Sequence, residues 1–281
     1  MIMKKIPGRM KIGIIGFGNM GSAISEQLKS RYEIIVFDQD KSKTAGLTGI
    51  NAAGRMQDLV GMAEVLILAV KPQDFDSVLR QIKGSLRDTP VISIAAGIST
   101  NYIERILGKV RVVRAMPNIG VKIGESVTCL AKGAFATDGD LELVQELFYY
   151  LGRTKIIEET MMNAATAISG SGPAYIFDYI AANSIDVQNI SIETKNNLVL
   201  RLEKAAESIG FNHEDAVSLA VTTTASSLSL VKQTKVSPLE LKKQVTSKGG
   251  TTEAGLAALE RTGSWEDAAR AALKRAEELS K

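Results

Sequence analysis

The chain has 281 residues, of which 45% are hydrophobic and 23% charged, and its formal net charge is +3. This composition is typical of a globular protein, and without a run of Lys or Arg it gives no reason to expect a nucleic-acid or membrane partner. The longest apolar stretches are strand-sized, as at residues 65–70, which excludes a membrane span. Residues 1–10 contain no apolar core of a signal peptide, so we expect a cytoplasmic protein.

The chain has one cysteine, Cys129, and one histidine, His213. These counts argue against a disulfide framework, a Cys/His zinc site and a Ser-His-Asp triad, and we expect no metal site. Cys129 lies in an apolar run and is predicted to be a core residue. His213 lies at a turn and helix start, where we predict an exposed capping residue.

The first half of the chain alternates strand-like and helical patterns. Runs rich in Ile and Val predict strands at residues 11–16, 33–38, 64–70, 90–95, 110–116 and 126–131. Helical or turn patterns lie at residues 19–29, 42–47, 57–62, 73–82 and 100–107. A further helix starts at Thr137, with Asp140 three positions later. The alternation predicts an α/β fold with a Rossmann-type, doubly wound parallel sheet.

The second half has a different texture. Strand patterns nearly vanish after residue 155, and Ala-, Leu- and Ser-rich helical patterns continue to the C-terminus. Ser237, followed by Pro238 and Glu240, is typical of a helix start, and another helix is predicted at residues 252–259. We therefore predict a dinucleotide-binding domain at residues 1–155 and an all-helical domain at residues 156–281.

A glycine-rich loop follows the first predicted strand and begins a predicted helix. Its sequence is Gly16-Phe17-Gly18-Asn19-Met20-Gly21. In this setting the three glycines provide a tight turn, backbone approach to a pyrophosphate and close helix–strand packing. The N–H groups of the helix N-terminus add a positive dipole end. We predict that this loop binds a nicotinamide dinucleotide; a glycine turn without a ligand is the alternative.

Three further segments are predicted to contact the cofactor. Asp38, at the end of the second strand, is typical of an acceptor for the ribose hydroxyls and favours NADH, although Lys41 and Lys43 nearby soften that preference. The other two segments end the strands at residues 64–70 and 90–95, and parallel strands line a ligand crevice with their carboxyl ends. They are Ala69, Val70, Lys71 and Pro72, and Ala95, Ala96 and Gly97. The sequence leaves open whether Lys71 reaches the cofactor or is a surface lysine.

Two segments of the second half are rich in small and hydroxyl residues, at residues 169–175 and 245–252. A glycine turn before a helix, as in the second, suits a small carboxylate; close helix–helix contact is the alternative for both. Together with the glycine loop, residues 69–72, 95–97 and 114–118, these segments resemble the pyrroline-5-carboxylate reductase family. The resemblance covers residues 11–279.

The resemblance implies a helical domain that dimerises, so that we expect a homodimer or a larger homo-oligomer. It also implies reduction of 1-pyrroline-5-carboxylate to L-proline, the last step of proline biosynthesis, by hydride transfer from NADPH or NADH. Members of the family that this sequence resembles commonly prefer NADPH. The substrate carboxylate would lie at Ser247, Gly249, Gly250 and Thr251, and the hydroxyl of Thr252 would lie near the ring nitrogen. A protonated imine is already electrophilic, so the enzyme mainly positions the reactants.

The chain departs from the family pattern in several places. Ile119 and Gly120 replace a Thr-Pro pair, Lys248 replaces a proline, and Met56 replaces an asparagine at the cofactor ribose. Residues 181–202 are predicted to be an insertion with a possible hairpin around Gln188-Asn189. We expect a peripheral decoration near the dimer interface, and a functional lid is the alternative.

Three other functions remain open from the sequence. A β-hydroxyacid dehydrogenase shares the glycine loop, but Ile176 stands where its catalytic lysine is required. An imine reductase acting on a related cyclic imine, such as the six-membered homologue, is not distinguished by sequence. A catalytically inactive nucleotide-sensing homologue would keep the fold, and the intact Ser247 and Thr252 argue against it.

Overall fold

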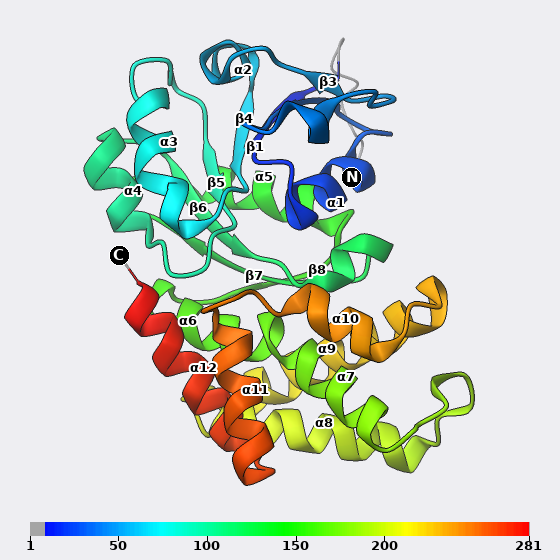
Figure 1. Cartoon of the computed structure of the whole chain (residues 1–281). Coiled ribbons are helices and arrows are strands. Elements are labelled where there is room, and N and C mark those ends of the chain that lie inside the picture. The colour runs from blue at the N-terminus through cyan, green and yellow to red at the C-terminus, as the bar shows by residue number, and fades with distance from the viewer. Residues whose placement is uncertain (1–8, 281) are drawn as a thin grey trace. The chain divides into compact units, whose positions relative to one another are not determined.

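The computed structural model describes residues 9–280 (Figure 1). It consists of two compact units. Of the described residues, the first unit takes those up to Ala95 together with Thr100–Arg114 and Lys132–Tyr150; the second takes Ala96–Ser99, Ala115–Ala131 and those from Leu151 onward. Of residues 1–10, on which the expectation about export rests, only Arg9 and Met10 are described.

The division differs from a single boundary after residue 155, because residues 115–131 group with the helices. Ile119 gives the physical reason, since it packs in one apolar cluster with Phe177, Leu230 and Leu241. Each unit is described by itself below.

The first unit is built on parallel strands in the order β3-β2-β1-β4-β5-β6. Ile14 of β1 is in register with Val36 of β2 and Ile67 of β4, and all three are fully buried. The order reverses at β1, which is the doubly wound arrangement with helices on both faces of the sheet. The predicted Rossmann-type sheet is confirmed. The strands are β1 (Lys11–Ile15), β2 (Glu33–Phe37), β3 (Asn51–Ala52), β4 (Val65–Leu68), β5 (Val91–Ser93) and β6 (Val112–Met116).

The helices of this unit follow the predicted segments closely. They are α1 (Asn19–Leu28), α2 (Met56–Met62), α3 (Phe75–Ile82), α4 (Thr100–Leu107) and α5 (Asp138–Tyr149), with 3₁₀ turns at Lys41–Thr44 and Pro72–Asp74. Thr137 begins α5 through a full capping box: its hydroxyl accepts from the Asp140 N–H, and the Asp140 carboxylate accepts from the Thr137 N–H. The prediction of this helix start is confirmed.

The second unit is mainly helical. Its strands β7 (Ser126–Lys132) and β8 (Gly152–Ile156) pair in parallel. β8 was not predicted, because its sequence carries Arg153 and Lys155 and has no apolar run. The helices are α6 (Met162–Ala165), α7 (Gly172–Ala182), α8 (Ile192–Glu207), α9 (His213–Thr234), α10 (Pro238–Val245), α11 (Thr251–Thr262) and α12 (Trp265–Leu279).

Short polar side chains cap the helices α8, α9, α10 and α12 of this unit. Ser237 accepts from the Glu240 N–H at 3.2 Å, as the Ser-Pro-Leu-Glu pattern predicts. Asn212, rather than His213, caps α9, because its side chain accepts from the Asp215 N–H at 2.9 Å. His213 is exposed at the first position of that helix, so its predicted place is confirmed but its capping role is wrong.

Residues 181–202 do not form a hairpin. Val187–Asn189 is a 3₁₀ turn, and α8 begins at Ile192 with the Ser191 hydroxyl accepting from the Thr194 N–H. Short apolar alternation fits a strand or a helix, and here the helix cap decides. The expectation of a peripheral decoration is wrong for the α8 part, since Leu198 and Leu202 are fully buried in the main helical core. That the segment is an insertion stays a prediction.

Among the described residues, none of the helices combines the length and the apolar character that a membrane crossing requires.

Candidate functional site

The glycine loop joins β1 to α1 in the first unit, and its glycines differ in what they contact. Gly16 has φ +100°, and a Cβ built there would lie 2.6 Å from the Ala69 carbonyl oxygen. A Cβ on Gly21 would lie 2.0 Å from the Gly16 carbonyl oxygen. Both residues are therefore required by the turn and by close packing of the protein itself.

Gly18 is the exception. A Cβ on this residue would meet no atom within 4 Å, and its φ of −82° is open to any residue. Gly18 is also the N-cap of α1, and no side chain among residues 9–280 caps that helix. The first N–H groups of a helix have no partner within it, so this end is an open anion cradle. A phosphate group fits the space that a Cβ would fill.

Asp38 ties the end of β2 to the loop. Its Oδ2 accepts from the Phe17 N–H at 2.7 Å, while Oδ1 accepts from the Asp40 N–H at 2.9 Å and from the Lys43 Nζ at 3.3 Å. Burial alone would raise the pKa of Asp38, but these hydrogen bonds outweigh it and hold the pKa below its usual value. The carboxylate is thus ionised at neutral pH and faces an exposed lysine.

The two predicted strand-end segments have different positions. Ala69 and Val70 follow β4 and lie beside Gly16. Lys71 is exposed and precedes the 3₁₀ turn that starts at Pro72. All four residues of this segment belong to the first unit. The segment after β5 is divided, since Ala95 belongs to the first unit and Ala96 to the second.

Gly97 also belongs to the second unit, where it lies beside the C-terminal end of α12. It has φ +71°, and a Cβ there would lie 3.0 Å from the Leu279 carbonyl oxygen. The structure therefore gathers the glycine loop, Asp38 and the residues after β4 within the first unit, while Ala96 and Gly97 are grouped with the helices.

The second predicted loop begins α11 in the helical unit. Gly249 has φ +70°, and the Gly250 N–H donates to the Ser247 carbonyl at 3.0 Å. A Cβ on Gly250 would lie 2.2 Å from the Ser247 Oγ, so a glycine is required beside this serine. Gly250 is the N-cap of α11 and, in the part of the chain that the structure describes, no side chain caps the helix, which leaves the N–H groups of Thr251 and Thr252 without a partner in their own helix.

A carboxylate already lies on this loop. The Gly249 N–H donates to Glu253 Oε2 at 2.8 Å, and the Arg275 Nε donates to the Gly249 carbonyl at 2.9 Å. The loop thus binds a carboxylate of its own chain, and the substrate site predicted there stays a prediction. In this structure, however, the N–H of Gly249 is used by Glu253, so that the donors left for a ligand include the Ser247 hydroxyl and the first-turn amides of α11.

The two hydroxyl-rich segments of the second half meet at Ser171. The Thr252 hydroxyl donates to the Ser171 Oγ at 3.1 Å, and the Thr251 hydroxyl lies 3.2 Å from the same oxygen. All three residues are buried. The contact between Ser171 and Thr252 is not predicted from the sequence, because 81 residues separate them. The only available signal was the repeated small-residue pattern in each segment.

The departures from the family pattern have local explanations. Gly120 leaves no room for a side chain, since a Cβ would lie 2.1 Å from the Ser226 Oγ, and Ile119 is packed in an apolar cluster. Met56 is buried, which is a core role, and Lys248 is exposed. Ile176 is fully buried among apolar residues, which gives no support to a catalytic lysine at that position.

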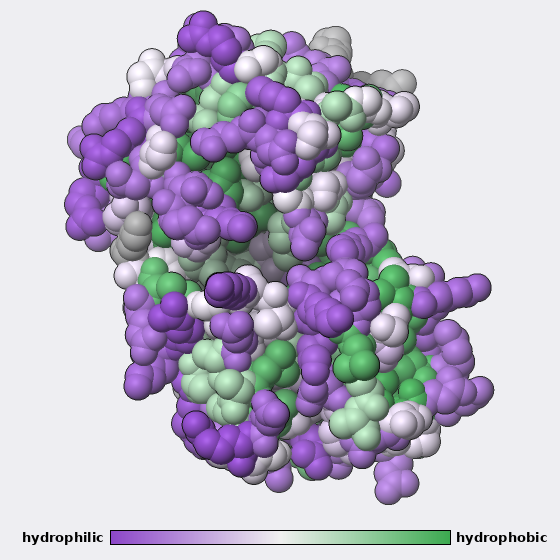
Figure 2. Space-filling model, viewed as in Figure 1, coloured by the Kyte–Doolittle hydropathy of each residue, from purple (hydrophilic) through white to green (hydrophobic). Residues whose placement is uncertain are grey.

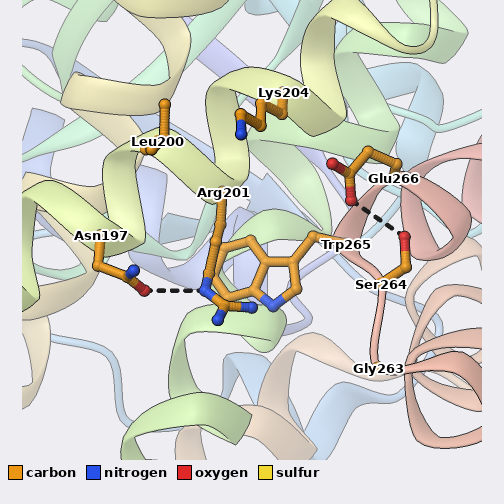
Figure 3. A pocket seen from close by; sticks show the side chains of 8 residues that line it. All are labelled: Asn197, Leu200, Arg201, Lys204, Gly263, Ser264, Trp265 and Glu266. Carbon is orange, nitrogen blue, oxygen red and sulfur yellow. Dashed lines mark hydrogen bonds between the residues drawn. The ribbon is translucent and has the colours of Figure 1, made fainter.

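A surface pocket of the helical unit contains none of the predicted site residues (Figure 3). It lies between α8 and the turn that joins α11 to α12. The Arg201 Nε donates to the Asn197 Oδ1 at 2.8 Å, and the Ser264 hydroxyl donates to the Glu266 carboxylate at 3.0 Å. Two pairs of polar side chains in the pocket are thus hydrogen-bonded to each other (Figure 3).

The single cysteine is buried, whereas the single histidine is exposed. Cys129 is fully buried, as predicted, and burial raises its pKa to about 12. His213 is exposed and its Nδ1 lies 2.8 Å from the Glu207 Oε1 and 3.6 Å from the Glu203 Oε1. These three residues are the one group within residues 9–280 whose ligand atoms are close enough to share a cation. The contacts of His213 with the two glutamates account for the geometry.

Comparisons with known proteins cover both units. Residues 11–97 match the family described as NADP oxidoreductase, coenzyme F420-dependent, and residues 197–279 match the family described as pyrroline-5-carboxylate reductase dimerisation. The pyrroline-5-carboxylate reductase of Aquifex aeolicus is 35% identical over 260 residues, which cover 90% of this chain and 90% of the relative.

Solved structures give the same result. A pyrroline-5-carboxylate reductase from Coxiella burnetii has a TM-score of 0.64 at 30% identity, over 98% of this chain and 100% of that one. The pyrroline carboxylate reductase of Plasmodium falciparum, solved with NADP bound, has a TM-score of 0.63 at 25% identity, over 97% and 98%. The similarity extends over nearly the whole chain.

Proposed function

Because this chain belongs to the pyrroline-5-carboxylate reductase family, we propose that it reduces 1-pyrroline-5-carboxylate to L-proline with NADPH or NADH. The observation that carries the proposal is the presence of two separate anion-accepting helix starts, at Gly18 and at Gly250, in a chain similar to these enzymes over nearly its whole length. One suits a dinucleotide phosphate and the other a small carboxylate.

The residues of the first unit would hold the cofactor, which supplies the hydride. The first-turn amides of α1 would receive the pyrophosphate over Gly18, where the protein leaves the space of a side chain open. Asp38 would accept from the ribose hydroxyls while it keeps the Phe17 amide in place. Its negative charge favours NADH, and the Lys43 ammonium at 3.3 Å reduces that preference without removing it.

The residues of the second unit would hold the substrate. The Ser247 hydroxyl and the amides of Thr251 and Thr252 would bind the carboxylate, and the Thr252 hydroxyl would contact the ring nitrogen. As hydride adds to the imine carbon, the π electrons of the C=N bond become the nitrogen lone pair, and the proton already on nitrogen stays there. No acid with a shifted pKa is then required, which agrees with a site built from amides and hydroxyls.

We also propose a homodimer formed through the helical unit, whose residues 197–279 match the dimerisation family. Large apolar side chains are exposed on its helices, and hydrophobic patches lie on this unit in the space-filling view (Figure 2). Ile192 is 71% exposed, Leu200 45% and Val221 46%. Light scattering after gel filtration tests the proposal: a monomeric mass at micromolar concentration would contradict it.

The activity is tested by initial rates of NADH and of NADPH oxidation, each with and without 1-pyrroline-5-carboxylate, with L-proline quantified as the product. We expect imine-dependent oxidation of both cofactors. If the six-membered cyclic imine were reduced faster than 1-pyrroline-5-carboxylate, the six-membered imine would be assigned as the substrate instead. Binding of NADH without oxidation in the presence of either imine would favour a sensor and contradict the proposed activity.

A further inference from the structure

The hydroxyl of Thr252 is bonded differently from other buried hydroxyls of the helical unit. Thr166, Ser169 and Ser227 each donate to the carbonyl one turn back in their own helix, at 2.9, 2.9 and 2.7 Å. Thr252 is the second residue of α11, so its helix offers no carbonyl one turn back. Its hydroxyl donates instead to Ser171, on another helical segment.

Ser171 is held firmly where it meets Thr252. The residues before it, Thr166–Gly170, form a π-helical turn, and the Ser171 N–H donates to the Thr166 carbonyl at 2.9 Å. Gly172, which follows, begins α7, where a Cβ would lie 3.0 Å from Leu202 Cδ1. Such π-helical turns frequently occur at functional sites, because the extra residue in the turn redirects a side chain. Ser171 is fully buried, so the segment cannot move without disturbing the core.

We propose that Ser171 is a positioning residue that fixes the hydroxyl of Thr252 for the ring nitrogen of the substrate. A hydroxyl has one proton and two lone pairs. When Thr252 donates its proton to Ser171, its lone pairs remain to accept from the N–H of a protonated cyclic imine. The role rests on the proposed function and adds to it the residue that orients Thr252.

The hydroxyl of Thr251 completes the arrangement. Its oxygen lies 3.2 Å from the Ser171 Oγ and offers an acceptor for the Ser171 proton. In this arrangement the Thr252 proton is directed to Ser171, and the Ser171 proton is directed to Thr251 or to the neighbouring Tyr175 hydroxyl, so that neither proton points at the substrate. A site arranged in this way selects the protonated imine, which is the form that accepts hydride, over the neutral one, whose nitrogen offers only a lone pair.

The test is a double-mutant cycle of Ser171→Ala and Thr252→Ala, with steady-state kinetics in both cofactors. Loss of one hydrogen bond lowers the kcat of Ser171→Ala by about three- to tenfold, with the KM for NADH or NADPH unchanged. If Ser171 acts through Thr252, the double variant has the kcat of Thr252→Ala alone. A purely structural role would make the two effects multiply.

Ser169→Ala is the matched control, since it removes an equally buried hydroxyl of the same segment that donates to the Ala165 carbonyl, one turn back in its own helix. We expect its kcat within about twofold of wild type. A second readout is product inhibition. L-Proline should inhibit Ser171→Ala more weakly than wild type, whereas cyclopentanecarboxylate, which lacks the nitrogen, should inhibit both equally.

Ser171→Cys keeps the size of the side chain and replaces Ser171→Ala if that variant does not fold. Multiplicative effects in the cycle, or equal loss in Ser169→Ala and Ser171→Ala, would overturn the role of Ser171 while an active wild type leaves the proposed function standing. A wild-type enzyme without imine-dependent oxidation would overturn the proposed function and, with it, this role.

Discussion

The Phe17 N–H donates to Asp38 Oδ2 at 2.7 Å, which joins the glycine loop to the end of the neighbouring strand through one carboxylate. Asp38 therefore has a structural partner as well as its predicted ribose partner. The other oxygen of the same carboxylate is paired with Lys43. Its charge and its contacts with the loop and with Lys43 both bear on cofactor choice.

We expect Asp38→Ser to raise the ratio of kcat/KM for NADPH to kcat/KM for NADH by about tenfold. The substitution removes the carboxylate that repels the 2′-phosphate of NADPH, and tenfold corresponds to roughly 1.4 kcal/mol. The variant also removes the partner of the Lys43 ammonium, which can then pair with the 2′-phosphate of NADPH. The measurement is kcat/KM for each cofactor. Asp40→Ser is the control, since Asp40 pairs with Ser42 on the same turn. An equal shift in both variants would mean that the overall charge of the turn, rather than Asp38, sets the preference.

Gly18→Val and Gly21→Val should behave in opposite ways. A side chain on Gly18 meets no protein atom, so we expect a melting temperature within about 4 °C of wild type. Nucleotide affinity should fall by about 100-fold or more, since blocking the cradle removes charge-assisted hydrogen bonds to phosphate.

A side chain on Gly21 meets the Gly16 carbonyl at 2.0 Å, and we expect Gly21→Val to lose about 3 kcal/mol of stability. Thermal unfolding and fluorescence titration with NADH check both variants. Unchanged NADH affinity in folded Gly18→Val would remove the phosphate role from this loop.

Thr252→Ala should lower kcat by about tenfold or more, because a positioning hydrogen bond to the ring nitrogen is lost. Thr251→Ala is the comparison, since its oxygen lies in the same cluster, 3.2 Å from the Ser171 Oγ. We expect a smaller effect there. Kinetics of Thr252→Ala that match wild type would take this residue out of the mechanism.

Cys129 should be inert in the folded protein. Burial raises the pKa of its thiol to about 12, and a thiol that stays protonated is a poor nucleophile. Native protein should therefore show no rapid reaction with Ellman's reagent at pH 8, and one thiol should react after unfolding in guanidinium chloride. Fast labelling before unfolding would show that the helical core opens easily.

His213 should stabilise the protein only at acidic pH. The hydrogen bond to Glu207 raises the pKa of His213 above its ordinary value of about 6.5. A raised pKa in the folded state gives stabilisation that is complete below the unfolded pKa and is lost as the pH rises through the folded pKa. Urea unfolding of His213→Gln should therefore differ from wild type at pH 5.5 and match it at pH 9.

The single histidine makes a direct check possible. Its NMR titration should give a pKa above 6.5 in wild type that returns towards 6.5 in Glu207→Gln. A larger effect of Glu203→Gln would contradict the assignment, because Glu203 lies farther from the imidazole, at 3.6 Å.

The elements that carry strong local signals were predicted well. The capping box of Thr137 and the Ser237–Glu240 start need only four neighbouring residues, and α5 and α10 begin there. The hairpin around Gln188-Asn189 was wrong because a short apolar alternation is compatible with two structures, and the Ser191 cap of α8 decides between them. The strand β8 was missed because three of its five residues are polar, namely Arg153, Thr154 and Lys155.

The sequence by itself determined the doubly wound sheet, the glycine loop, the acidic residue after the second strand and the helical second half, because each follows from periodicity or spacing over a few residues. Only the tertiary structure decided that Phe17 bonds to Asp38, that Gly249 is engaged by Glu253 and that Thr252 donates to Ser171. The contacts of Phe17 and Thr252 join segments that are distant in the chain, and a donor such as the Gly249 amide has several competing acceptors. Which acceptor it meets depends on how the elements pack, and local sequence patterns do not specify that packing.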